Sequence, residues 1–225
     1  MIIQVARHLY DLRERVVFLG GCATALLVTD PGVPEVRVTK DVDVIVEITS
    51  RLEYYRLEKE LQDRGFLKDL EEDSPVCRWL IEGIKVDVMP TQEDILGFSN
   101  RWYLPAIYHA EKLDLEEGLS IRLVTPPYFL ATKIEAFLGR GQGDYLASHD
   151  LEDILIVLDG RPEIITEIKN SPLDLIRFLS TAFKQLLGNK DFREALPGHL
   201  LPDKASQARI PRLIKCLQEI AEINS

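Results

Sequence analysis

Cysteine is scarce in this sequence, and long apolar runs are missing. The three cysteines, Cys22, Cys77 and Cys216, are too few and too scattered for a disulfide framework or a zinc cluster, so we expect reduced thiols. No apolar stretch approaches the roughly 20 residues of a membrane-spanning helix, and the N-terminal segment mixes charges with its apolar residues, unlike a signal peptide. These absences predict a cytoplasmic protein without a membrane partner.

Basic residues are also fewer than acidic ones. The chain has 27 Lys and Arg against 37 Asp and Glu, a formal net charge of −10, which disfavours nonspecific binding to a nucleic-acid backbone over most of the surface. The balance reverses in residues 181–225, which hold seven basic and five acidic residues. A polyanion would therefore approach the C-terminal segment most easily, although a solvated helix surface explains the same charges equally well.

The order of the apolar segments predicts an α/β (α+β) fold with a mixed sheet followed by helices. VVFLGG at 16–21 is typical of a buried strand that ends in a glycine turn, and CATALLV at 22–28 favours a helix. DVDVIVEI at 41–48 predicts a second strand, Ser50 to Gly65 a capped helix, and the Glu82-Gly83 pair a hairpin within 77–90. Five helical patterns follow residue 126. We therefore expect a sheet domain at 1–125 and a helical domain at 126–225.

Two aspartates one residue apart mark the second predicted strand. Side chains at i and i+2 of a strand point to the same face, so Asp41 and Asp43 project together, and Asp87 in IKVDVMP is suited to join them from a later strand. Carboxylates held side by side favour a divalent cation such as Mg²⁺, and three of them can hold two ions. The alternative for Asp41 and Asp43 alone is a strand face that meets solvent.

The glycine pair Gly20-Gly21 strengthens the first interpretation. Backbone N–H groups of a glycine turn, together with the positive end of a following helix, can hold a phosphate without a side chain in the way. A glycine pair before a helix is by itself more often a tight turn. The order of glycine turn, helix, paired aspartates and a later single aspartate is much more specific.

This order resembles the DNA polymerase beta-type nucleotidyltransferase superfamily, on the segments FLGGCATALL, RVTKDVDVIVE and IKVDVMP. The Arg, Thr and Lys before the first aspartate are similar to those of the bacterial AbiEii-type toxin nucleotidyltransferases. The resemblance covers roughly residues 16–90 and implies that Gly20 and Gly21 contact a nucleoside triphosphate and that Asp41, Asp43 and Asp87 bind Mg²⁺. Gly21 departs from the serine that is common at its position.

A second, weaker match lies in the helical half. LATKIEAFLGRG and SHDLEDILIVL resemble two helices of those toxins, which implies that Lys133 meets the triphosphate and that Asp150 is a further essential acid. An exposed helix charge is the alternative for Lys133, and a helix N-terminus that favours negative charge is the alternative for Asp150 and Asp153.

Other polar and aromatic side chains are weaker candidates. Arg37 and Thr39 share alternation with the aspartates if the strand extends that far, so they are candidate triphosphate ligands, with a structural ion pair as the alternative for Arg37. His149 is more readily a neighbour of a helix cap than a base. We expect Trp79 and Trp102 to pack in the core or at its rim, with stacking on a base as the alternative.

The resulting hypothesis is a Mg²⁺-dependent transfer of a nucleoside monophosphate from an NTP, such as ATP, to an acceptor hydroxyl, with two metal ions expected. The toxin resemblance implies an RNA acceptor, with a tRNA 3′ end as the first candidate, and an antitoxin protein as a partner. A small aminoglycoside-like alcohol is the alternative acceptor, since it suits the acidic surface. A module that binds nucleotide or protein without turnover is the third possibility.

Overall fold

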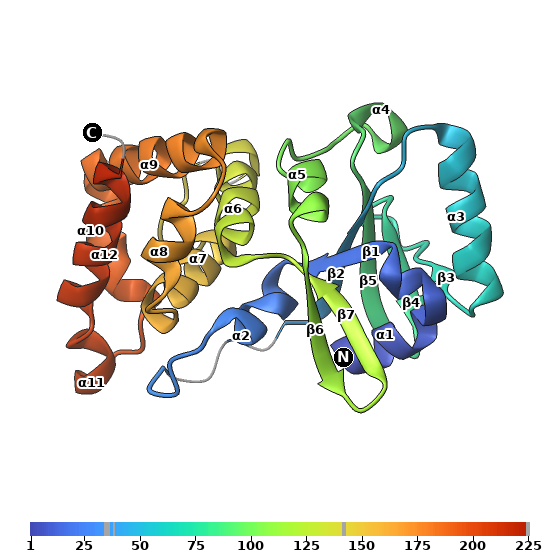
Figure 1. Cartoon of the computed structure of the whole chain (residues 1–225), viewed down its shortest axis with the longest axis horizontal. Coiled ribbons are helices and arrows are strands. Elements are labelled where there is room, and N and C mark those ends of the chain that lie inside the picture. The colour runs from blue at the N-terminus through green and yellow to red at the C-terminus, as the bar shows by residue number, and fades with distance from the viewer. Residues whose placement is uncertain (34–36, 38, 141–142, 224–225) are drawn as a thin grey trace. The chain divides into compact units, whose positions relative to one another are not determined.

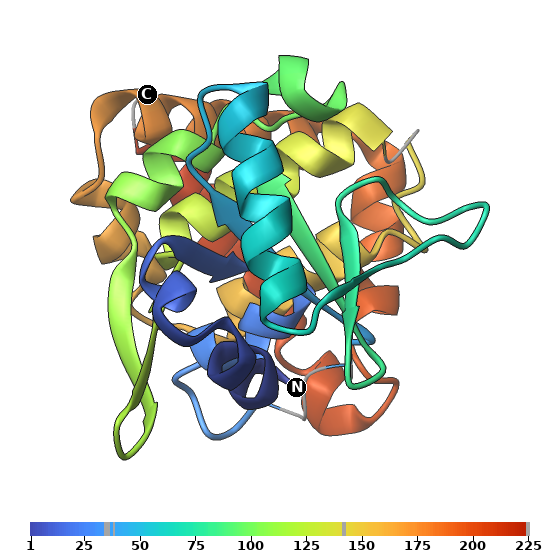
Figure 2. The same cartoon turned by 90° about the vertical axis from the view of Figure 1, so that its right-hand side faces the viewer.

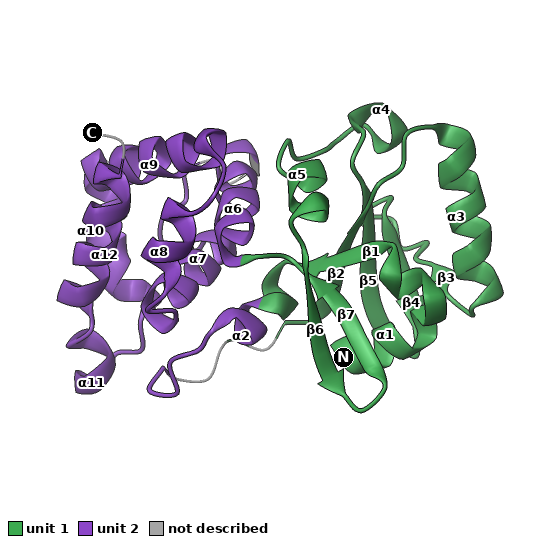
Figure 3. Ribbon diagram, in the orientation of Figure 1, with its two compact units in different colours: residues 1–23, 37–125 green, residues 24–36, 126–225 purple. Residues whose placement is uncertain are grey.

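The computed structural model describes residues 1–33, 37, 39–140 and 143–223. It divides the chain into two compact units (Figure 3). Unit 1 comprises residues 1–23 and 37–125, and unit 2 comprises residues 24–36 and 126–225. The chain therefore passes from unit 1 into unit 2 after residue 23, returns to unit 1 at residue 37, and enters unit 2 again at residue 126.

Unit 1 is built on a mixed sheet of seven strands in the order β3-β4-β5-β2-β1-β7-β6, which confirms the predicted fold class (Figure 1). The strands are β1 (Val16–Leu19), β2 (Asp41–Val46), β3 (Leu67–Lys68), β4 (Arg78–Ile81), β5 (Ile84–Pro90), β6 (Glu111–Glu116) and β7 (Leu119–Leu123). The β2–β5 and β1–β7 pairs are parallel, and the other four pairs are antiparallel. All four residues of β1 are buried, as expected for a strand near the middle of a covered sheet.

Short helical elements accompany this sheet. They are α1 (Ile2–Leu9), η1 (Tyr10–Glu14), η2 (Gly21–Ala23), α3 (Arg51–Asp63), α4 (Glu93–Leu96) and α5 (Tyr103–Tyr108). Helices α1 and α3 lie on the same face of the sheet (Figure 2), and Arg64 after α3 donates a hydrogen bond from Nε to the carbonyl oxygen of Leu9. Helix α3 buries Tyr54, Leu57 and Leu61, which follow the spacing of one helix face.

Two local predictions for this unit are confirmed. Ser50 caps α3, since its hydroxyl accepts a hydrogen bond from the Glu53 amide at 3.3 Å. Glu82 and Gly83 both have positive φ, at 49° and 77°, as the tight turn of a hairpin requires, and they join β4 to β5. This two-residue turn fixes the register of the hairpin, which decides the neighbours of Asp87.

Unit 2 is helical over its described residues. Its elements are α2 (Thr24–Leu27), α6 (Pro126–Arg140), α7 (His149–Gly160), α8 (Ile164–Lys169), α9 (Leu173–Gly188), α10 (Lys190–Ala195), η3 (Leu196–His199), α11 (Lys204–Gln207) and α12 (Ile210–Glu222). The helical part begins at residue 126, but residues 24–36, placed in the sheet domain from the sequence, group with this unit. Among the described residues of this segment, helix α2 contacts α7. Within the described residues, no helix combines the length and the apolar character needed to cross a lipid bilayer.

Candidate active site

The three predicted carboxylates lie on two neighbouring parallel strands. In the β2–β5 pair, Asp43 is in register with Asp87 and Asp41 is in register with Lys85. Residues in register on adjacent strands share a face, with backbones about 4.8 Å apart, so Asp43 and Asp87 are neighbours on one side of the sheet. Asp41 joins them two residues along the same strand. The structure thus brings together the trio that the sequence pattern singled out.

Arg78 is a fourth member of this group, and the sequence analysis missed it. It is in register with Asp87 across the β4–β5 hairpin, and its Nε and Nη2 atoms each donate a 2.7 Å hydrogen bond to a different oxygen of Asp87. Its Nη2 also lies 3.3 Å from Oδ2 of Asp41. The Arg78 and Asp87 side chains are only 16% and 11% exposed, whereas that of Asp41 is 38% exposed. The hydrogen bonds that the Arg78 guanidinium donates to Asp87 raise its pKa above the usual value, against the opposing effect of burial.

The contact with Arg78 bears directly on the expected metal site. Within the described ranges, no group of three Asp, Glu, His or Cys side chains is arranged to hold a metal ion. Each oxygen of Asp87 accepts one hydrogen bond from the guanidinium, so a cation at Asp87 would have to share these oxygens with Arg78 or displace it. The oxygen donors are of the kind that Mg²⁺ prefers, and Asp41 and Asp43 are partly exposed. The residues therefore fit a cation held first by Asp41 and Asp43.

The glycine turn lies directly beside this acidic group. Asp43 is in register with Leu19, the last residue of β1, and Gly20 follows with φ at +72°, in the left-handed region that L side chains avoid. A Cβ atom built on Gly20 would overlap the carboxylate of Asp43. Both the backbone conformation and the lack of space therefore require glycine at position 20.

The helix predicted at 22–28 lies one residue earlier and opens as a 3₁₀ turn. Gly21 opens a three-residue 3₁₀ turn, η2, in which the Ala23 amide donates to the Gly20 carbonyl at 3.1 Å, and α2 adds only a single turn after it. The Cys22 thiol donates to the Leu19 carbonyl at 3.2 Å. Because so few peptide dipoles are aligned here, any phosphate binding at this place depends on the amides of the turn more than on a helix dipole.

Arg37 and Thr39 lie before strand β2 and not within it, contrary to the condition under which they would share a face with the aspartates. Strand β2 begins at Asp41, so its alternation does not extend to Arg37 and Thr39. Arg37 is partly buried and Thr39 is 8% exposed, and residue 38 between them lies outside the described residues. Their predicted contact with a triphosphate stays a prediction.

Lys133 and Asp150 lie together within unit 2, as the resemblance grouped them. The Lys133 ammonium on α6 lies 3.2 Å from Oδ1 of Asp150 and 2.6 Å from Oδ2 of Asp153, both on α7. The three side chains are 12%, 10% and 1% exposed, so the alternative of an exposed helix charge for Lys133 is wrong. Asp153 is a partner that the sequence analysis did not assign, although its i+3 spacing from Asp150 places both on one helix face.

The remaining candidates fit their structural interpretations. Trp79 and Trp102 are 1% and 6% exposed, which leaves neither ring free to stack on a base. His149 is the first residue of α7, after its cap Ser148, and its exposed ring lies 3.1 Å from Glu152. Cys77 is buried next to the acidic group, and burial, followed by the charge of Asp87, raises the pKa of its thiol to about 12. It is therefore not a nucleophile at neutral pH.

The chain is similar in structure to a solved protein. No protein-family model matches the chain, and no curated protein matches it. A solved structure described as "Crystal structure of putative nucleotidyltransferase from H. pylori" is similar at 15% sequence identity and a TM-score of 0.44, and the match covers 99% of this chain and 89% of that one.

Proposed function

We propose that the protein is a nucleotidyltransferase that moves a nucleoside monophosphate from an NTP to an acceptor hydroxyl. One observation carries the proposal: the backbone of Gly20 lies against the carboxylate of Asp43, which shares a sheet face with Asp41 and Asp87. A turn whose amides can receive a triphosphate and carboxylates that can hold its counterions thus occur at the same place. The resemblance of the sequence motifs to the polymerase beta-type superfamily adds to this argument.

In the proposed reaction the acceptor oxygen attacks the α-phosphorus of the NTP. A new phosphorus–oxygen bond forms, the bond to the bridging oxygen of the β-phosphate breaks, and pyrophosphate leaves. Magnesium, when bound, would neutralise charge on the phosphates and lower the pKa of the acceptor hydroxyl. Asp41 and Asp43 would be its main ligands, and the turn at Gly20 and Gly21 would hold the triphosphate close to them.

Arg78 changes the role proposed for Asp87. A carboxylate that accepts two hydrogen bonds from a guanidinium already has its counter-charge beside it, and Asp87 is also the buried member of the trio. We therefore assign Asp87 to charge balance and, after exchange with Arg78, to metal binding. Proton removal from the acceptor falls to the more accessible Asp41 or Asp43.

In unit 2, we propose that Lys133 is held ready by Asp150 and Asp153 and exchanges one of these carboxylates for a phosphate oxygen of the NTP. Its short contact with the buried Asp153 would keep the ammonium oriented while the contact with Asp150 is exchanged. This role carries the resemblance to the toxin helices over to Lys133 and Asp150.

For the acceptor we propose RNA, with a tRNA 3′ end as the first candidate, and with it a toxin role that an antitoxin protein would restrain. The support is the motif resemblance and the excess of basic residues in 181–225. A small cationic alcohol remains the competing acceptor. Binding of nucleotide without transfer is the third outcome that an experiment must separate.

The test is incubation of the protein with each α-labelled NTP, Mg²⁺ and total RNA, followed by the same reaction with aminoglycoside alcohols in place of RNA. We expect label on RNA, reduced at least about a hundredfold in Asp43→Asn and Asp41→Asn, since positioned charge dominates such catalysis. Asp114→Asn is the matched control, because this strand carboxylate of unit 1 is 82% exposed. Label on the alcohol alone would reassign the acceptor, and equal transfer by Asp43→Asn would refute the proposed site.

A further inference from the structure

The crossover between the glycine turn and β2 belongs to the helical unit. We define the crossover as residues 24–33, the described part of the segment that leaves unit 1 after Ala23 (Figure 3). It begins with the single-turn helix α2, which continues directly from η2 of the glycine turn. Residues 21–27 are thus one unbroken helical stretch, with the proposed triphosphate turn at one end and unit 2 contacts at the other.

Backbone bonds fasten this crossover to the end of α7. The amides of Thr29 and Asp30 both donate to the carbonyl oxygen of Gly160, each at 2.9 Å. The Arg161 guanidinium donates to the carbonyl oxygen of Leu27 at 2.7 Å and forms two bonds of 2.7 and 2.8 Å with Glu167, which hold it in place. Arg161 therefore fixes the position of Leu27, the last residue of α2.

Packing at Gly160 is equally close. A Cβ atom built there would lie 2.8 and 3.0 Å from the methyl carbons of Val28 and 3.2 Å from a methyl carbon of Val33. A larger residue at position 160 would force the Val28 side chain to move, because the shortest of these contacts is below 3.0 Å and the other two are unusually tight.

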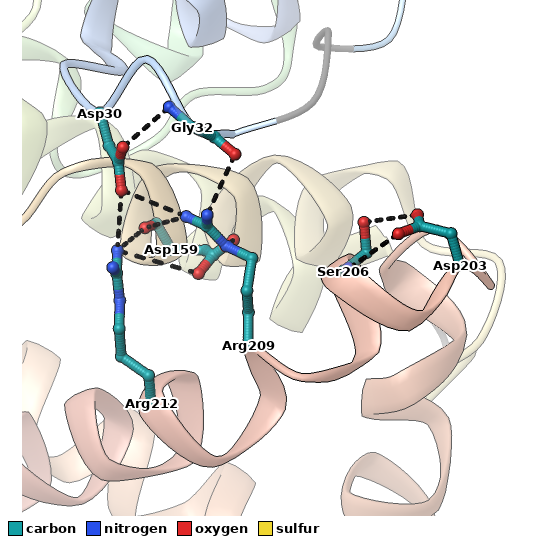
Figure 4. Close-up of polar contacts among 7 residues, drawn as sticks. All are labelled: Asp30, Gly32, Asp159, Asp203, Ser206, Arg209 and Arg212. Carbon is teal, nitrogen blue, oxygen red and sulfur yellow. Dashed lines mark hydrogen bonds and ion pairs between the residues drawn. The ribbon is translucent and has the colours of Figure 1, made fainter.

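Arg209 also holds the crossover, through the contacts with Asp30 and Gly32 that Figure 4 shows. Its Nε donates to Oδ2 of Asp159 at 2.7 Å, its Nη2 lies 3.3 Å from Oδ2 of Asp30, and its Nη1 donates to the Gly32 carbonyl at 3.1 Å. Arg212 adds a 3.3 Å contact with Asp30 and a bond to the Asp159 carbonyl. Arg209 thus contacts both the crossover and α7 with one planar group, as the forked geometry of arginine allows.

Burial separates the strong contacts from the weak ones. The Arg209 and Asp159 side chains are 19% and 7% exposed, whereas that of Arg212 is 52% exposed, so the Arg209–Asp159 pair contributes most. Two aspartates balance two arginines in this cluster, so it offers no spare positive charge for a phosphate. Its geometry suits a structural clamp and not a ligand site.

We propose that Arg209 is a positioning residue for the glycine turn: by holding Asp30 and Gly32 against Asp159 it fixes the crossover, and residues 21–27 transmit that constraint to Gly20 and Gly21. Arg209 would position the turn whether or not the protein binds a nucleotide. The effect of this positioning on nucleotide binding rests on the proposed function. Charge alone is not sufficient at this position, because a lysine cannot make the three directional contacts at once.

Two measurements on the full chain test this proposal without nucleotide. Hydrogen exchange reports on the amides of the crossover, and the alkylation rate of Cys22, assigned by peptide mapping, reports on the glycine turn. For Arg209→Ala we expect both rates to rise at least about tenfold, because several charge-assisted hydrogen bonds are lost. Arg209→Lys should give an intermediate rise and provides a variant that keeps the charge if the alanine variant does not fold. Arg177→Ala, an exposed arginine of α9, should match the wild type.

A rise in crossover exchange with unchanged Cys22 alkylation would overturn the proposal, since the clamp would then stabilise unit 2 alone. Unchanged hydrogen exchange in the crossover together with an unchanged alkylation rate of Cys22 would overturn it as well.

Nucleotide assays then separate this proposal from the proposed function. If the wild type transfers NMP, Arg209→Ala should raise the KM for NTP about tenfold with a smaller change in kcat, and Arg209→Lys should recover part of that loss. If the wild type transfers nothing, the proposed function fails, and the Cys22 result still decides whether Arg209 positions the turn.

Discussion

Replacement of Arg78 by methionine removes the guanidinium from the acidic group and keeps an apolar side chain of similar length. Asp87, whose side chain is 11% exposed, would lose two 2.7 Å hydrogen bonds and its counter-charge. Leaving one partner of a buried ion pair uncompensated costs about 3–5 kcal/mol. The longer contact with the more exposed Asp41 adds less than about 1 kcal/mol. The loss of Asp87 pairing therefore dominates the expected destabilisation.

Urea unfolding followed by tryptophan fluorescence measures this loss in the correct unit. Both tryptophans of the chain, Trp79 and Trp102, are buried in unit 1, so their emission reports on the sheet. With a urea dependence of about 1–3 kcal/mol per M, the midpoint for Arg78→Met should fall by at least about 1 M. Arg15→Met is the matched control, because Arg15 pairs with Glu60 at 2.8 Å but is 52% exposed, and its loss should cost less than about 1 kcal/mol.

Magnesium turns the same variant into a test of the metal site. Without Arg78, both oxygens of Asp87 become available next to Asp41 and Asp43, so Mg²⁺ should stabilise Arg78→Met more than the wild type. A ligand at a hundred times its Kd stabilises by about 2.7 kcal/mol, enough to recover most of the loss. Potassium chloride at equal ionic strength controls for screening. If Mg²⁺ and potassium chloride shift the midpoint equally, the three carboxylates do not form a metal site, and the argument from their register fails.

Three further predictions concern the turn and the helical unit. Gly20→Ala should lower NMP transfer at least about a hundredfold, because a Cβ there displaces the Asp43 carboxylate and strains the left-handed backbone; a wild-type rate would refute the close approach. Lys133→Met should destabilise unit 2 by about 3–5 kcal/mol in calorimetry, since Asp153 is 1% exposed and would lose its ammonium partner, whereas a change below about 1 kcal/mol would mean that the pair is not needed. NTP with Mg²⁺ should slow alkylation of Cys22, which lies in the turn, while Cys77, with a pKa of about 12, stays unlabelled at pH 8 with or without nucleotide; equal labelling of Cys22 in both conditions would place the nucleotide elsewhere.

Much of the acidic site could be predicted from local sequence. The alternation of Asp41, Val42 and Asp43 determines which side chains share a face, whatever the strand packs against. The Glu82-Gly83 turn determines the hairpin register, and counting outward from it pairs Arg78 with Asp87. The spacing of Arg78 and Asp87 about this turn therefore predicts their pairing from sequence alone.

Other parts depended on contacts between distant segments. The side chains of Asp30 and Arg209 are in contact although the two residues are 179 positions apart in sequence. No local pattern relates an aspartate in a loop to an arginine before the last helix. The same holds for the assignment of residues 24–36 to the helical unit. Gly160 carries no signal either, because a glycine at the end of a helix is ordinarily read as a cap.

The sequence by itself determined the elements and the faces of their side chains, because strand alternation, turn residues and helix caps act over a few positions. The tertiary structure decided which strands are neighbours. It therefore placed Asp87 beside Asp43, with its carboxylate hydrogen-bonded to Arg78. It also decided that the crossover is held by α7 and Arg209, since burial and ion pairing depend on distances that only the folded chain defines.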